Sequence, residues 1–172
     1  MRAPSHLLAA ALSFAVLANV ATAADLPLLA PVPTMTPHSA NGSFDVHIAP
    51  QALSGVAAAS GLGRMSIDKR FHGTLDATST GEMLAFRSAT ADGSAGYVAM
   101  ETVRGSLDGR RGSFVLQHSS TMARGAAAQS ITVVPDSGTD ALTGLAGRMV
   151  IDIAADGTHA YRFEFTLPDR AP

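Results

Sequence analysis

Apolar and polar residues alternate along most of the chain beyond residue 41, and this alternation is the clearest structural signal in the sequence. Phe44, Val46 and Ile48, for example, are separated by a polar residue at each intervening position. Because successive side chains of a β-strand point to opposite faces, a period of two predicts strands with one apolar face. Similar runs lie at 65–71, 84–86, 97–103, 114–122, 130–134, 149–153 and 161–167, between clusters of Gly, Asp and Ser. The pattern predicts an all-β domain of about eight strands, at the spacing of a sandwich or a barrel.

A repeated glycine motif adds to this pattern. Two glycines with the same spacing follow a leucine at residues 107–114 and again at 142–149. Each copy predicts a hairpin in which glycine supplies a positive φ. Repeated hairpins are typical of a meander that closes on itself, although glycine turns recur in other all-β folds as well. We interpret the domain as a closed antiparallel barrel, in which only the Ala-rich segment Gln51–Ser60 is a candidate helix.

The first 23 residues have the parts of a secretory signal peptide. A positive start at Arg2 precedes an apolar run over residues 7–20, and the small-x-small site Ala21-Thr22-Ala23 follows. The apolar run is shorter than the roughly 20 residues that a membrane span requires. We therefore expect cleavage after Ala23 and a periplasmic or secreted protein, and the alternative is an uncleaved anchor.

Residues 24–40 differ in composition from the rest of the chain. The segment contains Pro27, Pro31, Pro33 and Pro37. Proline lacks an amide donor and disfavours both helix and central strand. We expect residues 24–40 to be an extended proline-rich tether and residues 41–168 to be the β-barrel domain.

Composition and charge exclude several classes of function. Lys and Arg number 12 and Asp and Glu 14, so the net charge of −2 lacks the basic excess of a nucleic-acid binder. Aromatic residues are only 5% and include no Trp, which argues against base stacking. The absence of Cys excludes disulfides, thiol catalysis and cysteine-bound metals. No later run is apolar enough to span a bilayer, so we expect no stable membrane insertion.

Several segments resemble a bacterial family of small proteins of unknown function. They are GRMSIDKRFHG at 63–73, GSAGYVAMETVRGSLDGRRGSFVLQHSSTM at 93–122, VVPDSGTDALTGLAGRM at 133–149 and HAYRFEFTLP at 159–168. The resemblance implies a barrel like that of allene oxide cyclase, and the glycine motif after residue 137 also resembles a hairpin of allene oxide cyclases and plant dirigent proteins. The family has no established activity, so the resemblance implies no catalytic residue. Many members lack the signal peptide and the proline-rich tether, so export is a departure from the family.

Polar residues on otherwise apolar strand faces form the candidate ligand-binding site. Lys69, His118 and Tyr161 each share strand parity with apolar neighbours. Tyr97 and Glu101 lie on one face of the strand at 97–103, where both faces are mixed and the inward one is undecided. If these faces line the lumen of a barrel, the five side chains converge there.

His118 is expected to point inward and to pair with Glu101. An unpaired buried imidazole would be costly, so it needs a polar partner, and Glu101, Tyr97 and Tyr161 are the nearest candidates by pattern. A hairpin turn centred on Gly109 and Arg110 places Glu101 directly opposite His118. An imidazole beside a carboxylate is a candidate acid–base pair, so these two residues are the candidates for catalysis. The alternative is that His118 is an ordinary core histidine and that Lys69 extends to the barrel rim.

Other chemistry is not indicated. The remaining histidines lack ligand spacing and no cofactor-binding loop occurs, so we expect neither a metal nor a cofactor. We expect an exported barrel of unknown function that binds a small apolar ligand in its lumen. The alternatives are an isomerase-like or cyclase-like enzyme that acts on such a ligand, or a structural or interaction module with a filled barrel. The sequence leaves open the ligand, the oligomeric state, including a homo-oligomer, and whether the lumen is open.

Overall fold

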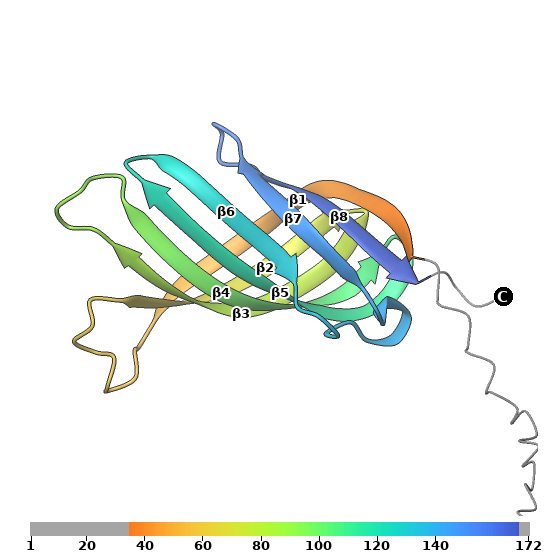
Figure 1. The fold of residues 1–172 in the computed structure, drawn as a ribbon, viewed down its shortest axis with the longest axis horizontal. Coiled ribbons are helices and arrows are strands. Elements are labelled where there is room, and N and C mark those ends of the chain that lie inside the picture. The colour runs from red at the N-terminus through yellow and green to blue at the C-terminus, as the bar shows by residue number, and fades with distance from the viewer. Residues whose placement is uncertain (1–34, 169–172) are drawn as a thin grey trace, which may run out of the picture. The chain divides into compact units, whose positions relative to one another are not determined.

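The computed structural model describes residues 35–168, which form one closed antiparallel barrel (Figure 1). Its strands follow one another around the wall in chain order, and β1 pairs with β8 to close it. The elements are β1 (Met35–Gln51), β2 (Gly63–Gly73), β3 (Leu75–Arg87), β4 (Ala95–Leu107), β5 (Arg110–Ala123), β6 (Ala126–Val133), the 3-10 helix η1 (Asp140–Leu142), β7 (Ala146–Ile153) and β8 (His159–Pro168). The predicted all-β barrel of about eight strands is confirmed. The predicted signal peptide at 1–23 lies outside the described residues.

The alternating pattern explains why these strands form a barrel wall. Inward-facing positions are even-numbered in β1 and β5 and odd-numbered in the other strands, and they are mostly apolar. Phe114 and Phe163 stack across the interior with their ring centroids 5.8 Å apart, and Phe165 packs beside Phe163 at 5.2 Å. Burying this face removes apolar surface from water, and this is the main favourable contribution to folding.

The first strand begins at Met35, six residues earlier than the barrel start expected at residue 41. Residues 35–41 pair with β8 and not with β2, so this part of β1 is bonded on one side only. A proline such as Pro37 is tolerated there because its missing amide donor is not needed by a second neighbour. The expected boundary of the tether is therefore wrong, since residues 35–40 belong to the barrel wall.

One end of the barrel is closed by side chains and by η1. Leu107, Leu142, Leu145 and Leu167 are buried there. This end lies at the right in Figure 1, where β8 ends. The predicted β4–β5 hairpin turns at Asp108 and Gly109, and Gly109 has a φ of +72°. The second glycine motif is not a tight hairpin, because η1 and its flanking loops connect β6 to β7.

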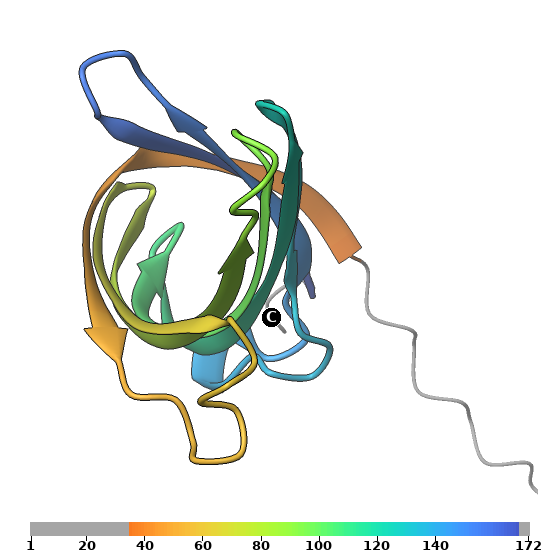
Figure 2. The ribbon, with the colours of Figure 1, turned by 90° about the vertical axis from the view of Figure 1, so that its left-hand side faces the viewer.

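The opposite end carries the β1–β2, β3–β4, β5–β6 and β7–β8 connections (Figure 2). We call it the open end, because the cavities of the barrel lie towards it. Residues 52–62 form turns and loops rather than the candidate helix. This segment is largely exposed and Val56 is 99% exposed, so no tertiary packing compensates for the weak helix propensity of its glycines. Within residues 35–168, no helix has the length and apolar character needed to cross a membrane.

Removing the first part of β1 is predicted to destabilise the barrel. A variant that begins at Asn41 loses the ladder to the end of β8 and uncovers Phe165 and Leu167, whereas one that begins at Met35 keeps both. We expect the shorter variant to lose more than about 2 kcal/mol of unfolding free energy, measured by urea titration. Equal stability of the two variants would contradict the structural role of residues 35–40.

Candidate functional site

A buried polar cluster lies inside the barrel, centred on Glu101 of β4. Glu101 is 0% exposed and accepts a hydrogen bond from Lys69 Nζ at 2.7 Å. The Ser79 hydroxyl donates to its other oxygen. His118 Nε2 lies 2.8 Å from Glu101 Oε2. These four residues come from the adjacent strands β2, β3, β4 and β5, so neighbouring parts of the wall meet at one carboxylate.

The sequence analysis named three members of this cluster and missed Ser79. Ser79 lies between Thr78 and Thr80, so the sequence around it reads as a run of hydroxyl residues, and its place on the inward face with Leu75 and Ala77 is not evident from that run. The signal that could have found it is the parity with Leu75 and Ala77, which places Ser79 inward.

The register expected for the β4–β5 hairpin is wrong by two residues. His118 is opposite Ala99, and Glu101 is opposite Leu116, because the turn is centred on Asp108 and Gly109. A shift of two residues keeps every side chain on its face, whereas a shift of one would reverse it. His118 therefore still points inward, and it contacts Glu101 as a diagonal neighbour.

The Glu101 carboxyl is held in its ionised form. Burial alone would raise its pKa, but the polar contact with His118 and the charge of Lys69 outweigh burial. The hydrogen bonds from Lys69 and Ser79 act in the same direction, so the pKa of Glu101 falls to about 2. A permanent negative charge thus sits in the barrel interior and fixes the side chains around it.

His118 approaches Glu101 closely, but its ring N–H is not aligned for a hydrogen bond. Nε2 lies 2.8 Å from the carboxylate oxygen, yet within the described residues it forms no hydrogen bond of acceptable angle. The contact is therefore an electrostatic one between the imidazole and the carboxylate. The His118 side chain is only 4% exposed and lines a cavity on the open side of the cluster.

Lys69 does not extend to the rim as the alternative interpretation required. Its side chain is 6% exposed, and its ammonium lies 4.9 Å from the centre of the Phe44 ring and 5.6 Å from that of Phe71. Aromatic faces attract cations, so the two rings contribute to holding a charge that also pairs with Glu101.

The cavity above this cluster has a volume of about 270 Å³. The buried side chains of Lys69 and His118 line it next to the cluster, and Tyr97 and Gln129 add polar groups to its wall. Its other lining residues are mostly apolar: Phe44, Val46, Ile48, Ile67, Met83, Ile151, Ile153 and His159. A second cavity of about 470 Å³ at the barrel mouth shares Met83 and Tyr97 with it. Burial raises the pKa of the half-buried Tyr97, partly offset by its contact with Gln129.

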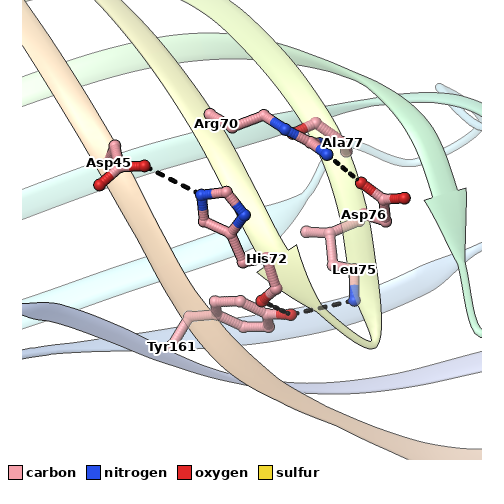
Figure 3. Close-up of polar contacts among 7 residues, drawn as sticks. All are labelled: Asp45, Arg70, His72, Leu75, Asp76, Ala77 and Tyr161. Atoms are coloured by element: carbon pink, nitrogen blue, oxygen red, sulfur yellow. Dashed lines mark hydrogen bonds and ion pairs between the residues drawn. The ribbon is translucent and has the colours of Figure 1, made fainter.

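Tyr161 is not part of this cluster, although the sequence grouped it with the other four candidates. Figure 3 shows its hydroxyl at the β2–β3 hairpin, where it donates to the His72 carbonyl at 3.2 Å and accepts from the Leu75 amide at 3.0 Å. Burial raises its pKa. Tyr161 lines neither cavity at the open end, so its geometry indicates that it stabilises the hairpin.

No metal centre is formed by the residues between 35 and 168. In this range, no three His, Asp or Glu side chains lie close enough together to bind one metal ion. His72, for instance, pairs with Asp45 at 2.9 Å on the exposed outer face (Figure 3).

The stability of the barrel is predicted to fall in acid because of Glu101. In the unfolded chain the Glu101 carboxyl binds a proton below about pH 4.3, whereas in the folded protein it stays ionised down to about pH 2. The free energy of unfolding therefore decreases as the pH falls through this window. The linkage amounts to about 3 kcal/mol. Urea unfolding between pH 6 and pH 3 should show about 2 kcal/mol of this loss in the natural protein and in Glu164→Gln, an exposed control, because the rest falls below pH 3. It should shrink in Glu101→Gln, and an unchanged slope in that variant would contradict the assignment.

Removing Lys69 is predicted to cost more than removing the whole ion pair. Lys69→Met leaves a buried carboxylate without its cation and should cost about 3–5 kcal/mol of unfolding free energy. The double variant Lys69→Met/Glu101→Leu should recover most of that loss, because it replaces both charged side chains with apolar ones and leaves no unpaired lysine or glutamate charge. Arg148→Met, which removes the exposed partner of Glu164, is the control and should cost under about 1 kcal/mol. A Lys69→Met cost as small as this control would refute the prediction.

Comparison with known proteins identifies the family. The family described as "Protein of unknown function (DUF3224)" matches residues 40–165. A crystal structure of a DUF3224 protein of unknown function from Shewanella oneidensis MR-1 is 46% identical with a TM-score of 0.69, over 80% of this chain and 100% of that one. No curated protein matches the chain. The expected likeness to allene oxide cyclase stays a prediction about the fold. With its match over most of the barrel, this chain belongs to the DUF3224 family, whose function is unknown.

Proposed function

We propose that this protein binds a small, mostly apolar molecule at the open end of its barrel, with the polar end of that molecule against Lys69 and His118. The observation that carries the proposal is the cavity of about 270 Å³, which has apolar walls and this pair of polar residues in its lining. Ligand sites commonly combine an apolar lining with a few convergent polar groups. A volume near the lower limit of such sites favours a small ligand.

Unused hydrogen-bonding capacity supports a polar end on the ligand. An ammonium group has three donors, and Lys69 uses one of them on Glu101 in the described residues. Nε2 of His118 lies 2.8 Å from Glu101 but has no hydrogen-bond partner within residues 35–168. Buried polar groups are normally satisfied, so a ligand that supplies an oxygen here would complete both side chains.

A second candidate function rests on the contact between His118 and Glu101. The negative charge of Glu101 lies 2.8 Å from Nε2 and favours the imidazole tautomer with its proton on that nitrogen. The other nitrogen, Nδ1, then carries a lone pair and can accept a proton from a bound molecule. This arrangement suits an isomerase-like or cyclase-like enzyme, in which His118 is the acid–base group and Glu101 orients it.

The proposal includes export to the periplasm or the medium. The positive start, the apolar run and the small-x-small site of residues 1–23 support it. A lumen that captures apolar molecules would then meet them outside the cytoplasm.

Filling the cavity is predicted to weaken ligand binding. Val46 lines the cavity, whereas Val98 is 54% exposed on the outer face of β4. In titrations with the fluorescent probe anilinonaphthalene sulfonate, Val46→Phe should lower the affinity at least about tenfold, while Val98→Phe should leave it unchanged. Urea unfolding checks that both variants fold.

Native mass spectrometry of protein purified from its own host complements this titration. A bound small molecule that is retained by the natural protein and lost from Val46→Phe would support the proposal. Absence of both a retained molecule and any probe binding that depends on Val46 would overturn it. For the enzyme alternative, conversion of the retained molecule by the natural protein and not by His118→Gln is the expected result.

A further inference from the structure

The wall of the barrel is incomplete between β6 and β7. The two strands pair at Ile131 with Met149 and at Thr132 with Arg148, and at no other position in the described residues. On either side, β6 pairs with β5 at eight positions and β7 with β8 at eight positions. Towards the open end, residues 126–130 therefore face residues 150–153 without main-chain pairing, and Figures 1 and 2 show the strands diverging there. We call this stretch the open seam.

A single side chain bridges the open seam. Gln129 Oε1 accepts a hydrogen bond from the Ile151 amide at 3.0 Å. If the ladder continued, Gln129 and Ile151 would be directly opposite each other, two positions beyond Ile131 and Met149. The glutamine side chain thus occupies the place of a main-chain partner, and within residues 35–168 no other hydrogen bond joins the strands at the seam.

The open seam leads into the cavity that holds Lys69 and His118. Gln129, Ile151 and Ile153 all line this cavity, and Ile153 is 66% exposed. The cavity at the barrel mouth adjoins this one and shares Met83 and Tyr97 with it. The seam is therefore a second connection between solvent and the polar cluster, separate from the mouth.

The edge of β6 also lacks the usual protection of an unpaired strand. Unpaired edges are normally blunted by charged residues or proline, yet residues 126–133 contain neither. The edge begins with three exposed alanines, Ala126 to Ala128, whose small side chains cover little of the backbone. An unprotected strand edge does not stabilise the barrel, but beside an apolar cavity it would give a ligand a way in from solvent.

We propose that the open seam is a side entrance to the lumen and that Gln129 is its latch. This inference rests on the proposed binding function and adds the path that a ligand follows. Widening the seam breaks one hydrogen bond, whereas widening the wall between β4 and β5 would disrupt a ladder of 13 paired positions. The barrel therefore opens between β6 and β7 first, and a ligand enters there with its polar end leading towards Lys69 and His118.

A reversible crosslink tests the entrance directly, because the natural chain has no Cys. Ser130→Cys/Val150→Cys places a pair on the outer face at the first position beyond the existing ladder, where oxidation would extend it. Val98→Cys/Ser119→Cys is the matched control, since these outward residues are directly opposite each other in a fully paired part of the wall. Stopped-flow fluorescence with anilinonaphthalene sulfonate measures the association rate.

The expected result is that oxidation lowers the association rate of the seam variant at least about tenfold and that reduction restores it, with no such change in the control. Gln129→Ala should raise the rate. An oxidised seam variant that binds the probe as fast as its reduced form would overturn the entrance while leaving the proposed binding function intact. Absence of probe binding to the natural protein would instead count against the proposed function.

Hydrogen exchange of the natural protein gives a readout that needs no substitution. The amides of residues 126–130 on the seam side and of 150–153 should exchange faster than those of β4, and the bound probe should slow them. Amides at the seam that are as protected as those of β4 in the free protein would overturn the inference whether or not the probe binds.

Discussion

The buried carboxylate of Glu101 constrains the rest of the barrel interior. A charge in an apolar interior is tolerated only when it is paired and hydrogen-bonded, and here Lys69, Ser79 and His118 supply those contacts. Each partner comes from a different strand, so β2, β3, β4 and β5 must keep one mutual register for the cluster to form. The carboxylate thus imposes geometric specificity on half of the wall, although the pair itself adds little net stability compared with an apolar replacement.

The same cluster divides the lumen into two regions. Towards the closed end, aromatic and leucine side chains pack tightly, as with the stacked rings of Phe114 and Phe163. At the level of Glu101, charged groups prevent apolar side chains from filling the barrel, and beyond it the interior is a cavity. The closed end therefore contributes most of the apolar burial, which allows the open end to remain unfilled.

The sequence predicted those features that depend on the period of two. Strand parity placed Lys69 and His118 on inward faces, and the alternation predicted the all-β barrel. Parity left the inward face of the Glu101 strand undecided, and Glu101 was found only as the expected hairpin partner of His118. Features that depend on partners distant in the chain were missed. The start of β1 was assigned to a tether because prolines hide a strand that pairs on one side, and Tyr161 was misplaced because its hydroxyl binds a hairpin formed by other strands. The two-residue register error arose because several turn positions are compatible with the same residues around Gly109.

The pairing of the strands gives the wall a stiff side and a loose side. Strands β2 to β5 are joined by long ladders and, on the inner face, by the contacts to Glu101. Across the lumen, β6 and β7 share two paired positions and the bridge from Gln129. A polar cluster needs fixed geometry, because a misplaced partner would leave the buried charge unsatisfied, whereas admission of a molecule needs a part of the wall that moves at low cost. The structure meets both requirements because the polar cluster is anchored on the strands that the ladders hold most firmly, and the cavity beside it extends to the strands that they hold least.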